Sequence, residues 1–375
     1  MRHYNINSYG KNKLDVYEIK NGILSSYRNI FERIQQVYIF GTKVLGKEVL
    51  QCCCNNGIKV IGFIDNDKTI QGQYIEGIRV YQLSEINPDE KYPIIIATLL
   101  YCHEIYNQLL KKGLENVIPY PILSLWNSKV FPEKFTLIHL QEDIVENYEE
   151  YKKLLMELED EKSRYILDKI FNFRLTMNYE YMSECCEQIY LPYFDEEILQ
   201  LNDNEVFLDA GGYIGDTTLN FIEVTQGAYK EILFFEPDKI LLEKAKSNLI
   251  LYSNITFYNK GIYSKSKVLK FNATNNETGK IDSNGNIEIA VVAIDELSSI
   301  RPSFIKMDIE GSEMDAINGM RNYIQTYRPK LAISVYHESS DIWKIPKLIR
   351  SINANYKFYL RQYTHSQLDT VLYCI

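Results

Sequence analysis

Two tandem series of short apolar segments, each alternating with stretches of helical length, constrain the fold of this chain most strongly. Segments that are apolar on both faces and alternate with helices are typical of parallel sheets. The first series predicts a small α/β domain over residues 36–125, after a lead-in of residues 1–35. Its strands are expected at 37–40, 59–64, 93–97 and 116–119, and its helices at 45–55 and 103–112.

The second series predicts a larger α/β domain over residues 201–375. The last two of its seven apolar segments follow each other with only a turn between them, so we expect a parallel doubly wound sheet that ends in a β-hairpin. Residues 126–200 are charged and rich in tyrosine, and their helical spacing predicts one or two connecting helices. The seven strands are expected at 206–208, 232–235, 255–258, 304–307, 331–335, 358–360 and 371–373.

Charge and composition exclude several classes of partner. The formal net charge is -9, and no basic stripe of the kind that binds nucleic acid is present. No apolar run approaches the roughly 20 residues that span a bilayer, and the N-terminus lacks the apolar core of a signal peptide. We therefore expect neither a nucleic-acid nor a membrane partner, and a cytoplasmic location. The seven cysteines form no C-x-x-C pair, which argues against a zinc ribbon.

The strongest local motif is the glycine-rich loop D-A-G-G-Y-I-G-D-T at residues 209–217, directly after an apolar strand. Glycines there allow a tight turn and a close approach to a ligand. Carboxylates flank the loop, and they would repel the pyrophosphate of a dinucleotide but suit a zwitterionic ligand such as S-adenosylmethionine. The predicted cofactor-binding residues of this loop are Asp209, Gly211, Gly212, Tyr213, Gly215, Asp216 and Thr217.

A second acidic residue follows the next strand, in the segment Phe235-Glu236-Pro237. Glu236 lies 236 − 215 = 21 residues beyond Gly215. A carboxylate at this spacing typically accepts hydrogen bonds from ribose hydroxyls. Loop and carboxylate together predict a nucleoside-containing cofactor, and Pro237 joins Glu236 in the predicted site.

The third motif, D-I-E-G-S-E at residues 308–313, follows the strand at 304–307 and precedes a helix. With the two motifs above, it resembles the FkbM family of S-adenosylmethionine-dependent methyltransferases over about residues 200–375. The resemblance implies a class I, Rossmann-like, seven-stranded methyltransferase domain. It also implies that Asn259 and Gly261 lie beside the adenine, and that Asp308 faces the sulfonium. The implied acceptor is a hydroxyl of a sugar, glycan or related small molecule.

Methyl transfer to a hydroxyl requires removal of its proton, by a general base or with the help of a metal. His337 is the first candidate for the base, because it follows the strand at 331–335 and its ordinary pKa of about 6.5 suits proton transfer. Asp308 and Glu310 are the alternatives. A divalent metal held by Asp308, Glu310 and His337 is a further alternative, although we assign no metal ligand from the sequence. No N-P-P-Y or D-P-P-Y loop of the amine-methylating type is present.

Two rival functions remain open at this point. The first domain, with F-G-T-K-V-L-G at 40–46 and G-F-I-D-N-D at 62–67, is similar to the Rossmann-like domains attached to sugar-modifying enzymes. A nucleotide-sugar enzyme or a dehydrogenase would use this domain, but Lys43 replaces the middle glycine of G-x-G-x-x-G and would crowd a pyrophosphate. The other rival is an inactive binding protein that keeps the methyltransferase fold.

Overall fold

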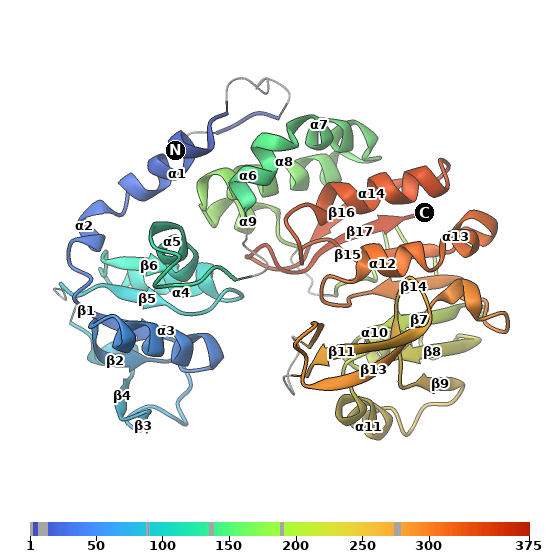
Figure 1. Cartoon of the computed structure of the whole chain (residues 1–375), viewed down its shortest axis with the longest axis horizontal. Coiled ribbons are helices and arrows are strands. Elements are labelled where there is room, and N and C mark those ends of the chain that lie inside the picture. The colour runs from blue at the N-terminus through green and yellow to red at the C-terminus, as the bar shows by residue number, and fades with distance from the viewer. Residues whose placement is uncertain are drawn as a thin grey trace. The chain divides into compact units, whose positions relative to one another are not determined.

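The computed structural model describes residues 3–6, 14–87, 89, 91–134, 139–187, 191–273 and 279–375. The chain folds into two compact units, which are taken separately below (Figure 1). The first unit comprises residues 1–152, 167–186 and 364–368, and the second comprises 153–166, 187–363 and 369–375. None of the helices in the described ranges combines the length and the apolar character that crossing a bilayer requires.

The first unit contains a six-stranded sheet in the order β3-β4-β2-β1-β5-β6. All neighbours in it are parallel except β3 and β4, which form an antiparallel pair. That pair was not predicted, because its strands are short and most of their residues are exposed or half-buried. The strands are β1 (Gln36–Phe40), β2 (Lys59–Ile64), β3 (Tyr74–Ile75), β4 (Ile78–Tyr81), β5 (Ile94–Ile96) and β6 (Val117–Pro119).

The two predicted helices of the first half, at 45–55 and 103–112, are present within one residue of their predicted bounds. Each is followed two residues later by a glycine, Gly57 or Gly113. The helices of the first half are α1 (Val16–Ser25), α2 (Arg28–Phe31), α3 (Val44–Asn55), η2 (Leu83–Glu85), α4 (Cys102–Lys111) and α5 (Tyr120–Trp126). The described part of the connector holds four helices rather than one or two, because capping residues interrupt the helical spacing: Asp160 accepts a hydrogen bond from Ser163 N (2.7 Å). The four are α6 (Leu140–Glu146), α7 (Tyr148–Glu157), α8 (Glu161–Thr176) and α9 (Glu180–Cys185).

The second unit contains a seven-stranded sheet in the order β16-β17-β15-β14-β7-β8-β9 (Figure 1). Its strands are parallel except β17, which runs antiparallel to both of its neighbours. The predicted α/β class, the seven strands and the terminal hairpin are therefore confirmed. The strands are β7 (Val206–Ala210), β8 (Glu231–Phe235), β9 (Ile255–Tyr258), β14 (Phe304–Met307), β15 (Lys330–Ser334), β16 (Phe358–Gln362) and β17 (Thr370–Cys374).

The helices of this unit are α10 (Asp216–Val224), α11 (Lys239–Asn248), α12 (Glu313–Asn318), α13 (Arg321–Tyr327) and α14 (Asp341–Ile352). The helical stretch after the acidic motif is divided at Gly319, where a Cβ atom would lie 2.0 Å from the carbonyl oxygen of Tyr263. An aromatic cluster fills the core between sheet and helices. The rings of Phe207 and Phe221 stack at 4.2 Å, and Phe304 lies 5.2 Å from Phe207.

A separate four-stranded sheet, in the order β10-β13-β11-β12, was not predicted. Most residues of its strands are exposed or half-buried, and the apolar run at 289–292 was not interpreted as a strand. Its small core consists of Phe271, Ile289 and Val291. The strands are β10 (Gly261–Ile262), β11 (Lys267–Asn272), β12 (Lys280–Ile281) and β13 (Ile287–Val292), followed by η4 (Ile294–Glu296).

The register of the seven-stranded sheet decides where the functional residues emerge. Ala210 is aligned with Phe235 on one side and with Met307 on the other, and Met307 is aligned with Ile333. Parallel strands in register end at the same edge of the sheet, where open α/β sheets bind ligands. The segments that follow β7, β8, β14 and β15 therefore meet at one edge.

Candidate active site

The glycine loop after β7 depends on two residues that admit no side chain. The backbone N–H groups of Gly211 and Gly212 donate to Phe235 O at 3.1 and 3.0 Å. Gly211 has a φ of +76°, and a Cβ on it would lie 1.9 Å from the carbonyl oxygen of Asp308. A Cβ on Gly212 would lie 2.3 Å from the ring of Phe234. The loop is therefore clamped between the ends of β8 and β14.

The helix after this loop, α10, begins without a side-chain cap. Gly215 is its N-cap and has a φ of +88°. Asp216 is the first helical residue, where a negative charge interacts favourably with the helix dipole. The free N–H groups at this helix end consequently point toward the loop without a side chain covering them.

Glu236 connects the glycine loop to the end of β8. Its side chain is buried and accepts hydrogen bonds from Tyr213 N (2.9 Å) and Asp238 N (2.8 Å). Burial raises the pKa of this carboxyl from 4.5 to about 7. The exposed Asn259 donates from Nδ2 to the carbonyl oxygens of Glu236 (3.1 Å) and Pro237 (2.9 Å). The residues predicted to hold the ribose and adenine thus form one connected group.

A buried ion pair supports the loop from inside the sheet. Lys306 Nζ lies 3.0 Å from Asp209 Oδ1, and both side chains are almost completely buried. Thr218 Oγ1 donates to Asp209 Oδ2 (2.7 Å), and Lys306 Nζ donates to the carbonyl oxygen of Gly211 (2.8 Å). The carboxylate of Asp209, predicted to lie near the methionine part of the donor, therefore faces the protein interior and holds the loop in place.

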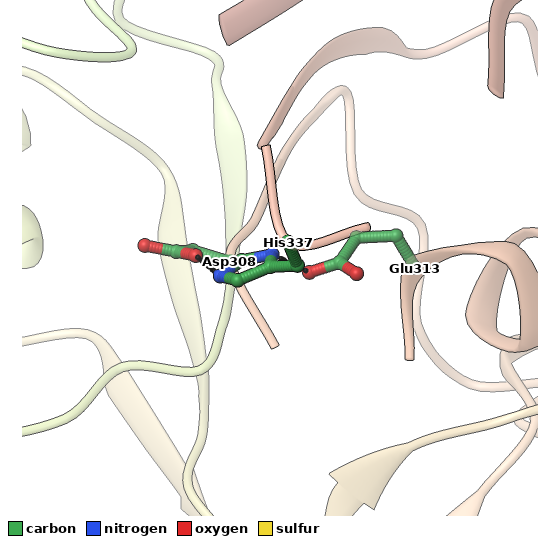
Figure 2. A group of neighbouring side chains, drawn as sticks. All are labelled: Asp308, Glu313 and His337. Carbon is green, nitrogen blue, oxygen red and sulfur yellow. Dashed lines mark ion pairs between the residues drawn. The ribbon is translucent and has the colours of Figure 1, made fainter. Parts of the chain in front are cut away.

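The acidic motif after β14 surrounds the ring of His337 (Figure 2). His337 Nε2 lies 3.2 Å from Asp308 Oδ1 and 3.6 Å from Glu310 Oε2. The other ring nitrogen, Nδ1, lies 3.1 Å from Glu313 Oε1, so the ring sits between Asp308 and Glu313. The ring is fully buried, whereas the side chains of Asp308 and Glu310 are 24% and 20% exposed. A ligand at this edge can reach those two carboxylates but not the imidazole.

The turn of the acidic motif is left-handed at two consecutive residues. Glu310 has a φ of +55° and Gly311 a φ of +92°. A non-glycine residue in this region costs about 1–2 kcal/mol, and such strain gathers at functional sites. Helix α12 begins only at Glu313, so Glu310 lies in the turn before it rather than on the same helical face.

The charges of this cluster shift one another's pKa. Burial would lower the pKa of His337, but Glu313 and Asp308 outweigh it and raise that pKa well above its ordinary value. Burial would raise the pKa of Asp308, but His337 and Lys306 hold it well below its usual range. Burial and the nearby charge of Glu313 raise the pKa of Asp341 to about 7. The cluster thus has more carboxylates than positive charges to balance them.

Tyrosine hydroxyls complete the surroundings of Asp308. Tyr193 donates to Asp308 Oδ2 (2.9 Å) and lies 3.0 Å from Ser334 Oγ. Tyr336 OH lies 3.4 Å from Asp308 Oδ1, a long hydrogen bond. These contacts hold the Asp308 carboxylate at the strand end.

The first unit has its own strand–loop–helix turn at residues 40–46. Thr42 donates to Asp65 Oδ2 from both its backbone N (3.0 Å) and its Oγ1 (2.7 Å). Asp65 follows β2, the place where a dinucleotide-binding domain holds the ribose. Here that carboxylate is bonded to the loop itself, and the exposed Lys43 precedes α3. These contacts weaken the case for a dinucleotide in this unit.

Two family models match the chain. The model of the methyltransferase FkbM domain matches residues 209–363, which contain the glycine loop, Glu236, the acidic motif and His337. Residues 209–363 belong to the methyltransferase FkbM family. A second model, described as C2185-like, N-terminal, matches residues 33–118. No curated protein matches the chain.

One solved structure extends the likeness beyond the FkbM domain. A methyltransferase FkbM from Methylobacillus flagellatus KT is similar over 99% of this chain and 100% of that chain, with 25% identity and a TM-score of 0.77. Aeropyrum pernix fibrillarin, solved with natively bound S-adenosyl-L-methionine, covers 48% of this chain and 70% of its own, with 10% identity and a TM-score of 0.32. Family and fold together support a methyltransferase that uses S-adenosylmethionine.

The FkbM domain brings the predicted site residues to one edge of its sheet. Asp209 is the exception, because its side chain faces the protein interior. The loop residues lie between β7 and α10, and the others follow β8, β9, β14 and β15. The predicted residues at the edge are Gly211, Gly212, Tyr213, Gly215, Asp216, Thr217, Glu236, Pro237, Asn259, Gly261, Asp308, Glu310 and His337. Their individual roles stay predictions.

Sequence reasoning missed three residues of this site. Lys306 had a usable signal, because a lone charged residue inside an apolar strand must find a buried partner. Glu313 is the last residue of the D-I-E-G-S-E motif, but it was assigned no role from the sequence. Tyr193 precedes Asp308 by 115 residues and lies in no motif, so the sequence carried no signal for it.

Proposed function

We propose that this protein transfers the methyl group of S-adenosylmethionine to a hydroxyl oxygen of a small molecule or glycan. The observation that carries the proposal is the close approach of the glycine loop to the acidic motif, which leaves no room for a Cβ atom between Gly211 and Asp308 O. The donor loop and the partly exposed carboxylates therefore lie against each other. S-adenosylmethionine, when bound, supplies a methyl group on a positively charged sulfur.

The chemistry of the donor-side residues fits this cofactor. The buried Glu236 presents carboxylate oxygens that can accept hydrogen bonds from ribose hydroxyls in addition to its two backbone donors. The carboxylates of Asp308 and Glu310 provide negative charge for a cationic sulfonium. The loop turns tightly at Gly211 and Gly215, with φ values of +76° and +88°, and such a turn lets the backbone approach a ligand closely.

A hydroxyl is the acceptor that the other side of the site supports best. The acidic motif stands where amine-methylating enzymes carry an N-P-P-Y or D-P-P-Y loop, and the family resemblance points to hydroxyls of sugars and similar products. The acceptor hydroxyl must lose its proton as its oxygen bonds to the methyl carbon, while the carbon–sulfur bond breaks and its electron pair stays on sulfur. The edge formed by Asp308 and Glu310 aligns that hydroxyl and assists loss of its proton.

Calorimetry with S-adenosylmethionine and with NAD, followed by turnover on a panel of sugars and glycans, tests the proposal. We expect binding of the donor but not of NAD, and formation of methyl ethers on at least one hydroxyl compound. Binding of NAD alone would favour the dehydrogenase alternative. Donor binding without methylation of any compound would favour an inactive binding protein. Methylation of an amine instead of a hydroxyl would overturn the acceptor assignment.

A further inference from the structure

We propose that Asp308, Glu313 and His337 bind a divalent cation, with Glu310 at the rim of the site. Binding of the ion by these residues is independent of the proposed function. Its catalytic use, to bind the acceptor hydroxyl and make it more acidic, rests on that function.

Three possible ligand atoms lie close together. One oxygen of Asp308, one oxygen of Glu313 and one ring nitrogen of His337 all lie within 4.8 Å of one another. Neighbouring ligands of an ion with bonds of about 2.1 Å lie roughly 3 Å apart, and opposite ligands roughly 4 Å apart. Asp308 and Glu313 contact different ring nitrogens, at 3.2 and 3.1 Å, so binding of one ion by all three requires the imidazole to turn until one nitrogen faces the ion together with both carboxylates.

The net negative charge of the cluster favours binding of a cation. Asp308, Glu310 and Glu313 surround one imidazole, so even a protonated ring leaves an excess of two negative charges at a largely buried place. The charge of Lys306 reaches Asp308, but its ammonium is already paired with Asp209 at 3.0 Å. Buried charge is costly unless it is balanced, and a divalent ion would balance it.

The surroundings hold the two carboxylates in place as a built site rather than a loose acidic surface. Glu313 is 1% exposed and its Oε1 accepts a hydrogen bond from Ile309 N (2.9 Å). Its second oxygen, Oε2, is buried and has no hydrogen-bond partner among the residues that the structure describes. Tyr193 orients Asp308 through Oδ2, which leaves Oδ1 beside His337. Two carboxylates and an imidazole suit a first-row divalent ion such as Mn²⁺.

The position of the cluster gives the ion a role in methyl transfer. The backbone of Asp308 touches the glycine loop at Gly211, so the ion would lie beside the donor. A hydroxyl bound to the ion on the side of the exposed carboxylates would have a lowered pKa. Its proton passes to water, its oxygen forms the bond to the methyl carbon, and the electrons of the carbon–sulfur bond stay on sulfur.

Titration of the EDTA-treated full chain with Mn²⁺ alone, followed by electron paramagnetic resonance and calorimetry, tests the site. We expect one ion per chain. Glu313→Gln and His337→Gln should each weaken binding at least about 10–100-fold, which is the loss typical for even an outer-shell partner of a metal. Glu243→Gln, which changes an exposed carboxylate on α11, should leave binding unchanged. Absence of Mn²⁺ binding in the native protein, or an affinity of the two site variants equal to that of the native protein, would overturn the proposal.

A second measurement covers variants that fold poorly and separates this inference from the proposed function. Mn²⁺ should raise the melting temperature of the native protein and of Glu243→Gln, and should not raise that of Asp308→Asn. S-adenosylmethionine binding is measured separately on EDTA-treated protein. Donor binding without Mn²⁺ binding overturns the cation site alone, whereas Mn²⁺ binding without donor binding overturns the proposed function alone.

Discussion

At the scale of single residues, Gly211 carries the largest steric constraint of the donor loop. Gly211→Ala would place a methyl group 1.9 Å from Asp308 O in a backbone of φ +76°. We expect a loss of more than about 3 kcal/mol of unfolding free energy, since the left-handed backbone costs about 1–2 kcal/mol and the carbonyl must move besides. Donor binding should be lost with it. Denaturant unfolding and calorimetry measure both effects.

Gly227 is the matched control for this substitution. It has a nearly equal φ of +74°, but a Cβ on it would meet nothing within 4 Å. Gly227→Ala should therefore cost only about 1–2 kcal/mol, from the backbone alone, and leave donor binding intact. If the two variants lost equal amounts of unfolding free energy, crowding against Asp308 would not contribute to the destabilisation of Gly211→Ala.

Glu236 predicts a pH dependence of donor affinity. Its pKa is raised to about 7 by burial, so the carboxyl is mostly protonated at pH 6 and mostly ionised at pH 8. Ribose hydroxyls donate better to the ionised form, so affinity for S-adenosylmethionine should rise from pH 6 to pH 8. Calorimetry across this range measures it. Glu236→Gln should weaken donor binding and remove the dependence of affinity on pH. The control Glu223→Gln, which changes an exposed carboxylate on α10, should change neither the affinity nor its pH dependence.

At the scale of elements, the ion pair between Lys306 and Asp209 couples β14 to β7. Lys306→Met would leave the fully buried Asp209 carboxylate without its cation. Breaking a buried pair on one side typically costs about 3–5 kcal/mol, and we expect a loss of that order in denaturant unfolding.

The double variant Asp209→Asn with Lys306→Met checks the cause of that loss. It removes both charges, so part of the lost stability should return. A double variant no more stable than Lys306→Met would mean that the unpaired carboxylate is not the source. The two strands would then depend on other contacts of Lys306, such as its hydrogen bond to Gly211 O.

At the scale of the whole molecule, the second unit includes segments that precede residue 201. Arg361 in β16 is 1% exposed and is paired with Asp160 (2.8 Å) and Asp195 (2.7 Å). Its guanidinium also donates to Ser163 Oγ (3.0 Å). A fragment of residues 201–375 lacks all three partners. It should therefore be less stable, by about 3–5 kcal/mol, than a fragment of residues 153–375.

Thermal melting followed by circular dichroism compares the two fragments. We expect a cooperative transition for the longer fragment and a much lower or absent transition for the shorter one. In the full chain, Asp160→Asn should lower the melting temperature, while Glu161→Gln, at a 92% exposed side chain, should not. Equal melting of the two fragments would contradict the importance of these partners.

The sequence alone identified the seven strands of the second sheet and the edge at which its motifs meet. Those strands are apolar on both faces, and that pattern is local, so it can be read without knowledge of the fold. It did not identify β3 and β4 or the four-stranded sheet, whose strands are short or partly exposed. Such strands depend on pairing with distant segments, and even the apolar run at 289–292 does not record which strand it pairs with.

The motif residues were placed by the same local reasoning, because parallel strands in register end together. The environment of each residue was decided by tertiary structure. Asp209 turns inward because Lys306 from another strand meets it, and His337 is buried between carboxylates of two segments. Burial and charge at a site are sums over neighbours that are distant in the sequence. Only the folded arrangement of those neighbours determines which carboxylates face a ligand and which support the protein from within.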